Sequence, residues 1–239
     1  MNHVNIRDNY HRVQEWITKA AVNAGRNRES IRLVVVTKTH PIEVIQAVLE
    51  AGASDIGENY VEEAIPKMQS VGDKHGINWH MVGHVQSRKA NDVCQYFQYL
   101  HSLDSVKLGE RLSRCLVELN KSLPVWLEFN VGGEESKSGW NISTDENWFH
   151  LLPDIEKIIS LPKLELLGVM AIPPFSNNPE ESRPYYRRLR KFQEYIIDHF
   201  QLTDFKELSM GMSGDFEVAI QEGSTCVRIG QAILGPRSG

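Results

Sequence analysis

The sequence predicts a single-domain (β/α)8 TIM barrel, a fold of the α/β class. Short apolar runs alternate with longer helical patterns from one end of the chain to the other, which is typical of repeated βα units. The 239 residues are close to the roughly 250 residues that one such barrel uses. No Gly-x-Gly-x-x-Gly motif follows the first strand, so the alternative, an open doubly wound sheet, is less favoured.

The individual elements follow from the spacing of apolar residues along the chain. An amphipathic helix at about 6–24 precedes the repeats, and the polar loop at 132–139 lies between two βα units. We therefore take 1–239 as one domain. Strands are predicted at 33–37, 54–57, 79–83, 99–103, 125–131, 166–172, 207–210 and 226–230. Helices are predicted at 42–51, 60–71, 88–97, 106–120, 144–160, 179–200 and 215–222.

The composition argues against several classes of function. A net charge of -5 and a pI near 6.0 leave no general basic field for nucleic acid or an anionic membrane. The one basic run, at 183–191, is better explained as a solvated helix face. The cysteines and histidines lack the spacing of a disulfide framework or a metal site, and no segment resembles a signal peptide or a membrane span. We expect a cytoplasmic protein without metal, nucleic-acid or membrane partners.

Lys38 is the first candidate for chemistry. It follows the apolar run at 33–37, and Pro41 begins a new element three residues later, so its amine is expected at the C-terminal end of a strand. Barrel enzymes keep their chemistry at that end. A lysine there either points into solvent or has a depressed pKa and acts as a nucleophile toward a carbonyl group.

Two segments near the end of the chain are suited to bind phosphate. The run SMGMSGD at 209–215 begins at the end of the seventh predicted strand, and RIGQ at 228–231 begins at the end of the eighth. Their small residues let backbone N–H groups approach an anion, and barrels commonly bind phosphate with these two loops. The glycines could instead be turn residues and Ser213 a helix N-cap. A phosphate clamp facing the amine of Lys38 is the arrangement needed to hold pyridoxal 5′-phosphate (PLP).

Aligned strand ends bring further polar residues to the same mouth of the barrel. The set comprises Lys38, Glu58, Asn59, His84, Asn130, 170–171, 209–213 and 228–231. Seven segments carry a more specific signal: VVTKTHP (35–41), GENYVEE (57–63), WHMVGHVQSRK (79–89), ESKSG (135–139), GVMAI (168–172), LSMGMS (208–213) and VRIG (227–230). Together and in this order they resemble the pyridoxal phosphate homeostasis protein family, and the resemblance covers nearly the whole chain.

The resemblance implies a barrel similar to the N-terminal domain of alanine racemase, with PLP held as a Schiff base on Lys38. Asn59 would then lie beside the cofactor, and Arg228 would face the pyridine nitrogen. Gln231 departs from the small residue that is frequent in the family, so only its backbone N–H is expected to contribute. Four residues would hold the phosphate: Ser209, Ser213, Gly230 and Gln231.

An arginine beside the pyridine nitrogen would limit the chemistry of the cofactor. A guanidinium is a permanent cation with donors only, so the nitrogen stays unprotonated and the ring is a weaker electron sink. Racemases of the similar fold add a tyrosine from a second, C-terminal domain, for which we expect no counterpart here. Tyr60 and His84 are the nearest substitutes, although a packing aromatic and a structural hydrogen bond explain them better.

We therefore expect a PLP-binding protein of vitamin B6 homeostasis, with no catalytic residues and little or no turnover. Its expected partners are PLP and, as recipients of the cofactor, PLP-dependent apoenzymes, and we expect a monomer. The alternative is a PLP-dependent amino-acid racemase that uses His84 or Tyr60 as the second acid or base. A Schiff-base aldolase is a third reading, for which only Glu58 offers the carboxylate partner that such a site needs.

Overall fold

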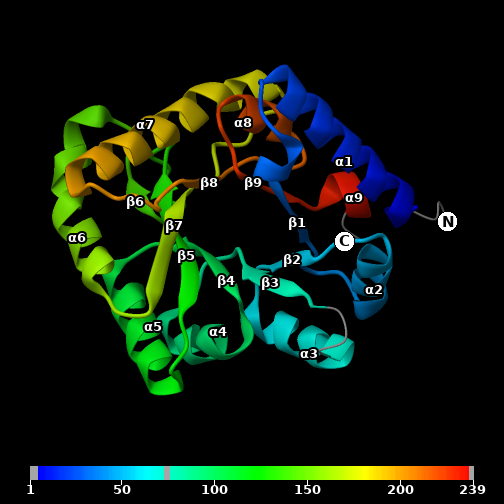
Figure 1. Ribbon diagram of the computed structural model, residues 1–239, viewed down its shortest axis with the longest axis horizontal. Coiled ribbons are helices and arrows are strands. Elements are labelled where there is room, and N and C mark those ends of the chain that lie inside the picture. Colours follow the sequence, from blue (N-terminus) through cyan, green and yellow to red (C-terminus); the bar gives the residue numbers. More distant parts are fainter. Residues whose placement is uncertain (1–4, 73–75, 237–239) are drawn as a thin grey trace.

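Eight parallel strands form a barrel in the computed structural model, which describes residues 5–72 and 76–236 (Figure 1). The barrel strands are β1 (Arg32–Val36), β2 (Asp55–Glu58), β3 (Asn78–Met81), β4 (Tyr99–Leu103), β5 (Leu123–Asn130), β7 (Leu164–Met170), β8 (Glu207–Ser209) and β9 (Cys226–Ile229). Each strand pairs with the next in this order, and β9 pairs with β1, which closes the sheet. The predicted fold class is confirmed.

The helices form a ring outside the barrel (Figure 1). They are α1 (Ile6–Asn23), α2 (Ile42–Glu50), α3 (Val61–Val71), α4 (Ala90–Tyr96), α5 (Val106–Leu119), α6 (Leu152–Ser160), α7 (Arg183–Phe200), α8 (Phe216–Gln221) and α9 (Gln231–Leu234). Helix α1 precedes the first strand and packs against α8 and α9. Within the described ranges, no helix is long and apolar enough to cross a membrane.

Helix α5 shows how the local sequence sets an element. Leu108, Leu112 and Leu116 recur every four residues and are buried, so one face of the helix packs against the barrel. The Ser105 hydroxyl accepts the backbone N–H of Leu108 at 3.4 Å and caps the first turn. Asn120 adopts a left-handed conformation (φ +50°) and ends the helix. The helix predicted at 106–120 therefore agrees with the structure to within one residue.

Three features differ from the predicted elements, and the first is the short helix α9, which was not predicted. The short strand β6 (Trp140–Asn141) pairs with the end of β5 directly after the polar loop, where no strand was predicted. Two residues are too short to show a periodicity. In addition, the helices predicted at 88–97, 144–160 and 179–200 each begin with a 3₁₀ segment, at Ser87–Lys89, Asp145–Leu151 and Pro179–Ser182.

The barrel wall separates two kinds of buried side chain. Outward-facing residues such as Val35, Leu127 and Val169 are apolar and belong to the core shared with the helices. By contrast, His101 on β4 lies 2.7 Å from the hydroxyl of Ser209 on β8, although these two strands are not neighbours in the sheet. Their contact must therefore cross the inside of the barrel, which carries polar groups below the mouth.

Candidate functional site

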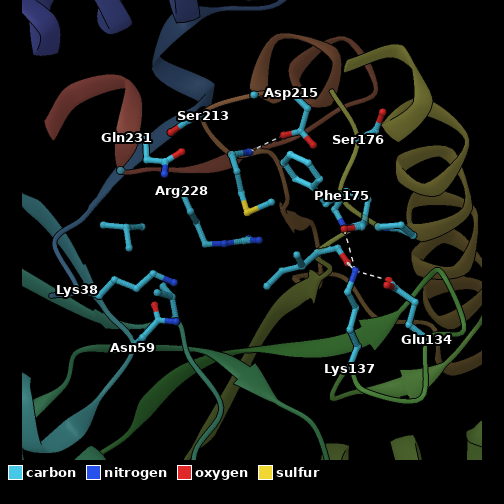
Figure 2. A pocket seen from close by; sticks show the side chains of 18 of the residues that line it. Lys38, Asn59, Glu134, Lys137, Phe175, Ser176, Ser213, Asp215, Arg228 and Gln231 are labelled. Atoms are coloured by element: carbon cyan, nitrogen blue, oxygen red, sulfur yellow. Dashed lines mark hydrogen bonds and ion pairs between the residues drawn. The ribbon is translucent and has the colours of Figure 1, made fainter. Parts of the chain in front are cut away.

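A cavity of about 530 Å³ opens where the barrel strands end (Figure 2). Its size is typical of a small-molecule site. Its lining comes partly from the ends of β1, β2, β8 and β9, which are consecutive around the barrel, so the cavity lies over one side of the mouth. Six of the seven predicted site residues line it: Lys38, Asn59, Ser213, Arg228, Gly230 and Gln231.

Lys38 extends from the end of β1 into this cavity (Figure 2). The sheet continues one residue past the strand, because the backbone N–H of Thr37 donates to the carbonyl of Gly57 at 2.9 Å. The next residue after Lys38, Thr39, adopts a left-handed conformation with φ +65°. This is rare for a β-branched residue, so the turn that carries Lys38 is held by its surroundings.

The loops after β8 and β9 are joined to each other beside the cavity. The hydroxyl of Ser213 accepts the backbone N–H of Ala232 at 3.2 Å, and the backbone N–H of Arg228 donates to the carbonyl of Gly211 at 2.9 Å. Gly211 has φ +98°, and a Cβ there would lie 2.6 Å from the Cβ of Ala219, so the position requires glycine. The two predicted phosphate loops thus form one rigid unit.

Asp215 fixes the shape of the first of these loops. Its carboxylate accepts the backbone N–H of Met212 at 2.8 Å, the hydroxyl of Tyr186 at 2.7 Å and the hydroxyl of Ser182 at 2.9 Å. Burial and then the charge of Asp215 raise the pKa of Tyr186 well above its ordinary value, so its hydroxyl stays protonated and donates. The loop is therefore held from α7.

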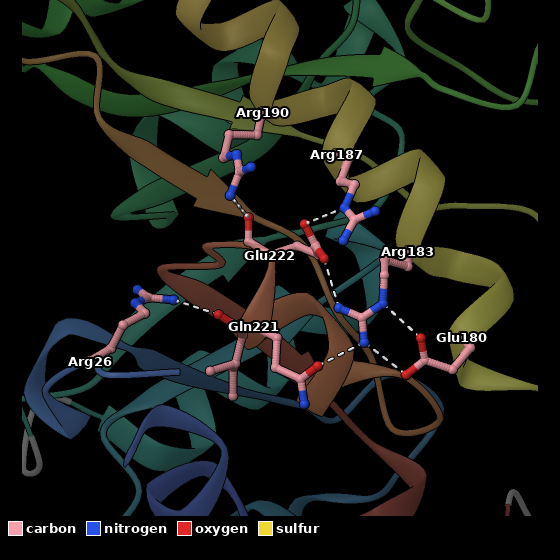
Figure 3. A network of polar contacts seen from close by, with 8 residues as sticks. Arg26, Glu180, Arg183, Arg187, Arg190, Gln221 and Glu222 are labelled. Carbon is pink, nitrogen blue, oxygen red and sulfur yellow. Dashed lines mark hydrogen bonds and ion pairs between the residues drawn. The ribbon is translucent and has the colours of Figure 1, made fainter. Parts of the chain in front are cut away.

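A second set of contacts ties α7 to the end of α8 (Figure 3). The buried carboxylate of Glu222 accepts from Arg183 at 2.7 Å and from Arg187 at 3.1 Å. Arg190 donates to the Glu222 carbonyl at 3.3 Å. The interpretation of the basic run at 183–191 as a solvated helix face was therefore incomplete, because three of its arginines bind the end of the helix that follows the first predicted phosphate loop.

Arg228 is almost fully buried beneath the cavity. Its guanidinium donates to the hydroxyl of Ser209 at 2.5 Å and to the carbonyl of Ala171 at 3.1 Å. Burial lowers the pKa of Arg228, but an arginine in a protein keeps its charge near neutral pH. The cavity floor thus carries a fixed cation that can only donate hydrogen bonds.

A chain of hydrogen bonds continues from Arg228 down through the barrel. The Ser209 hydroxyl lies 2.7 Å from Nδ1 of His101. Nε2 of His101 lies 2.9 Å from Nδ1 of His80, whose own Nε2 lies 3.0 Å from Oδ1 of Asp55. We refer to Ser209, His101, His80 and Asp55 as the interior relay.

The interior relay has a fixed direction. The direction is set at the lower end, because the ionised carboxylate of Asp55 can only accept a hydrogen bond. Burial lowers the pKa of both histidines, for His101 well below its ordinary value, so each carries one ring proton. The Nε2–H of His80 therefore donates to Asp55, and its Nδ1 accepts the Nε2–H of His101. Nδ1 of His101 then accepts the hydroxyl of Ser209, which in turn accepts from Arg228. Every donor therefore points from the arginine toward the carboxylate.

The structure places Ser209 differently from the sequence-based expectation. It was expected to hold a phosphate, but it is fully buried and does not line the cavity. The physical reason is that Ser209 is the last residue of β8 and its side chain points into the barrel. There its hydroxyl forms hydrogen bonds with Arg228 and His101. Ser209 supports the arginine rather than facing the cavity.

Several lining residues were not predicted. His40 stands in the same motif as Lys38, so that motif could have indicated it. On the wall opposite Lys38, Lys137 forms an ion pair with Glu134 and donates to the carbonyl of Pro173 at 2.9 Å (Figure 2). Phe175 is 89% exposed at this wall. Loop residues of this kind give no periodic signal in the sequence.

The other residues considered for catalysis lie outside the cavity lining. Tyr60 is 54% exposed at the start of α3. His84 Nδ1 lies 2.7 Å from the Asp104 carboxylate, a structural hydrogen bond of the kind expected. Glu58 is fully buried and contacts Lys67 of α3 at 2.9 Å. Glu58 therefore faces the helix layer and does not supply the carboxylate that an aldolase site would need.

Comparison with known proteins agrees with this geometry. The alanine racemase N-terminal domain family matches residues 3–238. A pyridoxal phosphate homeostasis protein of Aquifex aeolicus (strain VF5) is 38% identical over 226 residues, which cover 95% of this chain and 96% of the relative. The chain belongs to the pyridoxal phosphate homeostasis protein family.

Solved structures similar to this family member extend the comparison. PipY of Synechococcus elongatus PCC7942, in a structure with PLP bound, is 31% identical with a TM-score of 0.78, covering 92% of this chain and all of PipY. Alanine racemase of Clostridium difficile 630 is 15% identical with a TM-score of 0.71, covering 98% of this chain and 57% of the racemase. At that identity, the racemase shows a shared barrel fold only.

Proposed function

We propose that this chain binds PLP reversibly as a Schiff base on Lys38 and serves intracellular PLP and vitamin B6 homeostasis. The observation that carries the proposal is the meeting of an amine, a buried guanidinium and a joined pair of small-residue loops at one cavity. The PLP-bound structure of the related PipY gives independent support.

The residues present fit this cofactor. PLP supplies an aldehyde, with which the amine of Lys38 condenses with loss of water. Arg228 would face the pyridine nitrogen as a donor-only cation. The Ser213 hydroxyl accepts from Ala232 and keeps its own proton to donate, so it suits a phosphate oxygen. Gly230 belongs to the same loop pair, and a Cβ there would lie 3.1 Å from the Val36 carbonyl.

The same geometry supports binding and release with no turnover. A permanent cation beside the ring nitrogen disfavours its protonation and so weakens the ring as an electron sink. Among the described residues that line the cavity there is no tyrosine, and Tyr60 and His84 lie outside it. We expect PLP-dependent apoenzymes to receive the cofactor.

The test is a PLP titration of wild type beside Lys38→Ala and the matched control Lys137→Ala. We expect a visible absorption band in wild type and Lys137→Ala that is missing in Lys38→Ala. Borohydride reduction and peptide mass spectrometry should find the modified lysine at position 38. Equal bands in wild type and Lys38→Ala would rule out Lys38 as the attachment site.

Turnover is tested by solvent-deuterium exchange at Cα of a panel of amino acids. Because His40 lines the cavity close to Lys38, a racemase remains the second candidate. We expect no exchange at enzymatic rates. Exchange at about 1 per second or faster that disappears in His40→Ala would replace the carrier proposal with the racemase.

A further inference from the structure

A buried cluster of charged side chains surrounds the backbone that carries Lys38. Lys67 of α3 is only 8% exposed, and its Nζ contacts Glu58 at 2.9 Å and Glu63 at 2.6 Å. The same Nζ donates to the carbonyl of Thr37 at 3.1 Å. We refer to Glu58, Glu63 and Lys67 as the α3 clamp.

The α3 clamp holds the main chain on both sides of Lys38. Before the lysine, the Thr37 hydroxyl donates to Glu58 at 2.6 Å, in addition to the carbonyl contact with Lys67. After the lysine, the backbone N–H of Thr39 donates to Glu63 at 2.6 Å. Thr39 is also the residue with the rare positive φ of 65°. The carboxylate of Glu63 therefore stabilises the strained turn directly.

Stability alone is a poor explanation for this cluster. Removing charges from water is costly, and well-packed apolar residues of similar volume often serve stability equally well. The contacts of the α3 clamp are also directed at two peptide groups rather than spread over the helix interface. Because peptide groups are planar, fixing one on each side of Lys38 limits the directions in which its side chain can leave the backbone.

We propose that Glu58, Glu63 and Lys67 are positioning residues that orient the amine of Lys38 toward the cavity. The reactivity of an amine toward an acylating reagent depends on its pKa and on its exposure to solvent, and both depend on where the side chain points. Loss of this support should therefore be visible in the reactivity of the amine. The inference deepens the proposed function and rests on it for the role of Lys38. The reactivity itself can be measured without PLP.

The experiment is competitive labelling of lysines with acetic anhydride, followed by mass spectrometry, in protein without added PLP. The exposed Lys19 of α1 serves as the internal reference. Glu63→Ala is the main variant, since its side chain is 27% exposed and the fold should tolerate the change. Glu62→Ala is the matched control, because Glu62 lies next to it on α3, is 61% exposed and pairs with Lys89.

We expect Glu63→Ala to change the labelling of Lys38 relative to Lys19 by about tenfold or more and to weaken PLP binding, with Glu62→Ala like wild type. Glu63→Gln keeps an acceptor for the Thr39 amide, so the labelling of Lys38 in this variant should stay within about threefold of wild type. Thr37→Val removes the hydroxyl that donates to Glu58 before Lys38, so it is an independent test if Glu63→Ala fails to fold. We expect it to shift labelling in the same direction as Glu63→Ala.

Labelling of Lys38 within about twofold of wild type in both Glu63→Ala and Thr37→Val would overturn the inference. Equal changes in Glu63→Ala and Glu62→Ala would overturn it as well. If the labelling of Lys38 changed as much in Glu63→Gln as in Glu63→Ala, the hydrogen bond from the Thr39 amide to Glu63 could not be what orients Lys38. If wild type did not bind PLP but the variants still differed from it in the labelling of Lys38, only the proposed function would be refuted.

Discussion

Lys38 and Arg228 face the same cavity, but the protein supports them with opposite chemistry. The backbone around Lys38 is held from outside the barrel by the α3 clamp, which consists of charged groups. The side chain of Arg228 is held from inside the barrel by the interior relay, whose two histidines are neutral. Lys38, the residue that reacts in the proposed function, is thus fixed through its main chain, whereas Arg228, which does not react, is fixed through its side chain.

The two supports should respond differently to substitution and to pH. Removing one charge from the α3 clamp leaves the other charges buried without a partner, which is costly. Breaking the interior relay leaves neutral donors and acceptors unpaired, which costs less. Three measurements test this contrast, and one more tests a buried carboxylate whose pKa also depends on the charge of Arg228.

The largest effect is expected for Lys67→Met. This change leaves the carboxylates of Glu58 and Glu63 close together without their shared cation, so we expect a loss of about 3 to 5 kcal/mol in the free energy of unfolding. Urea denaturation measures the loss. Lys89→Met is the control: its pair with Glu62 lies at the surface and should be worth less than about 1 kcal/mol. Equal losses would refute the special role of the buried cluster.

A smaller effect is expected for His101→Phe. The phenyl ring can keep the stacking of His101 on Trp126, whose ring centre lies 4.0 Å away, but it removes both hydrogen bonds of the imidazole. Unpaired buried groups on Ser209 and His80 should cost about 1 to 3 kcal/mol. The exposed His199→Phe is the control. We also expect weaker PLP binding, since Arg228 loses its support; unchanged affinity would limit the relay to a structural role.

Glu128→Gln tests how a buried site on β5 tolerates the negative charge of an ionised carboxylate. Burial, and then the charge of Asp104, raise the pKa of Glu128 from 4.5 to about 7, against the opposing effect of Arg228. Between these values the folded protein holds a proton that the unfolded chain has released, so this contribution to stability is complete below pH 4.5 and is lost as the pH rises through 7.

We therefore expect Glu128→Gln to be more stable than wild type by about 1 to 3 kcal/mol at pH 8 and similar to it at pH 5. Urea denaturation at the two pH values measures the difference. The surface variant Glu156→Gln should show no such pH-dependent gain. A constant difference between Glu128→Gln and wild type at both pH values would show that Glu128 does not titrate in this range.

The contribution of the interior relay to stability is expected to fall in the acid range. The pKa of His80 and of His101 is lowered by burial, so their contribution to stability is complete above the ordinary histidine value of 6.5 and is lost as the pH falls below it. Wild type should lose up to about 1.4 kcal/mol per pH unit for each such histidine below 6.5. His101→Phe should have a shallower slope. If stability fell equally steeply with pH in wild type and in His101→Phe, the acid sensitivity would come from groups outside the interior relay.

The sequence could predict much of this site because its residues stand at strand ends. Lys38, Asn59 and Arg228 each lie near the C-terminal end of a predicted strand, and such ends meet in a closed parallel barrel. Ser209 shows the limit of that reasoning. A strand end can direct its side chain into the cavity or into the barrel, and only the packing around Arg228 and His101 decides between them.

The sequence by itself determined the barrel, its order of strands and helices, and the lysine that faces the cavity, because these depend on local periodicity and on where strands stop. Tertiary structure alone decided how the site is supported. Lys67 meets Thr37 from 30 positions away, and Ser209 meets His101 from 108 positions away. Neither contact leaves a pattern along the chain, since each depends on which side chains of distant elements the closed barrel brings together.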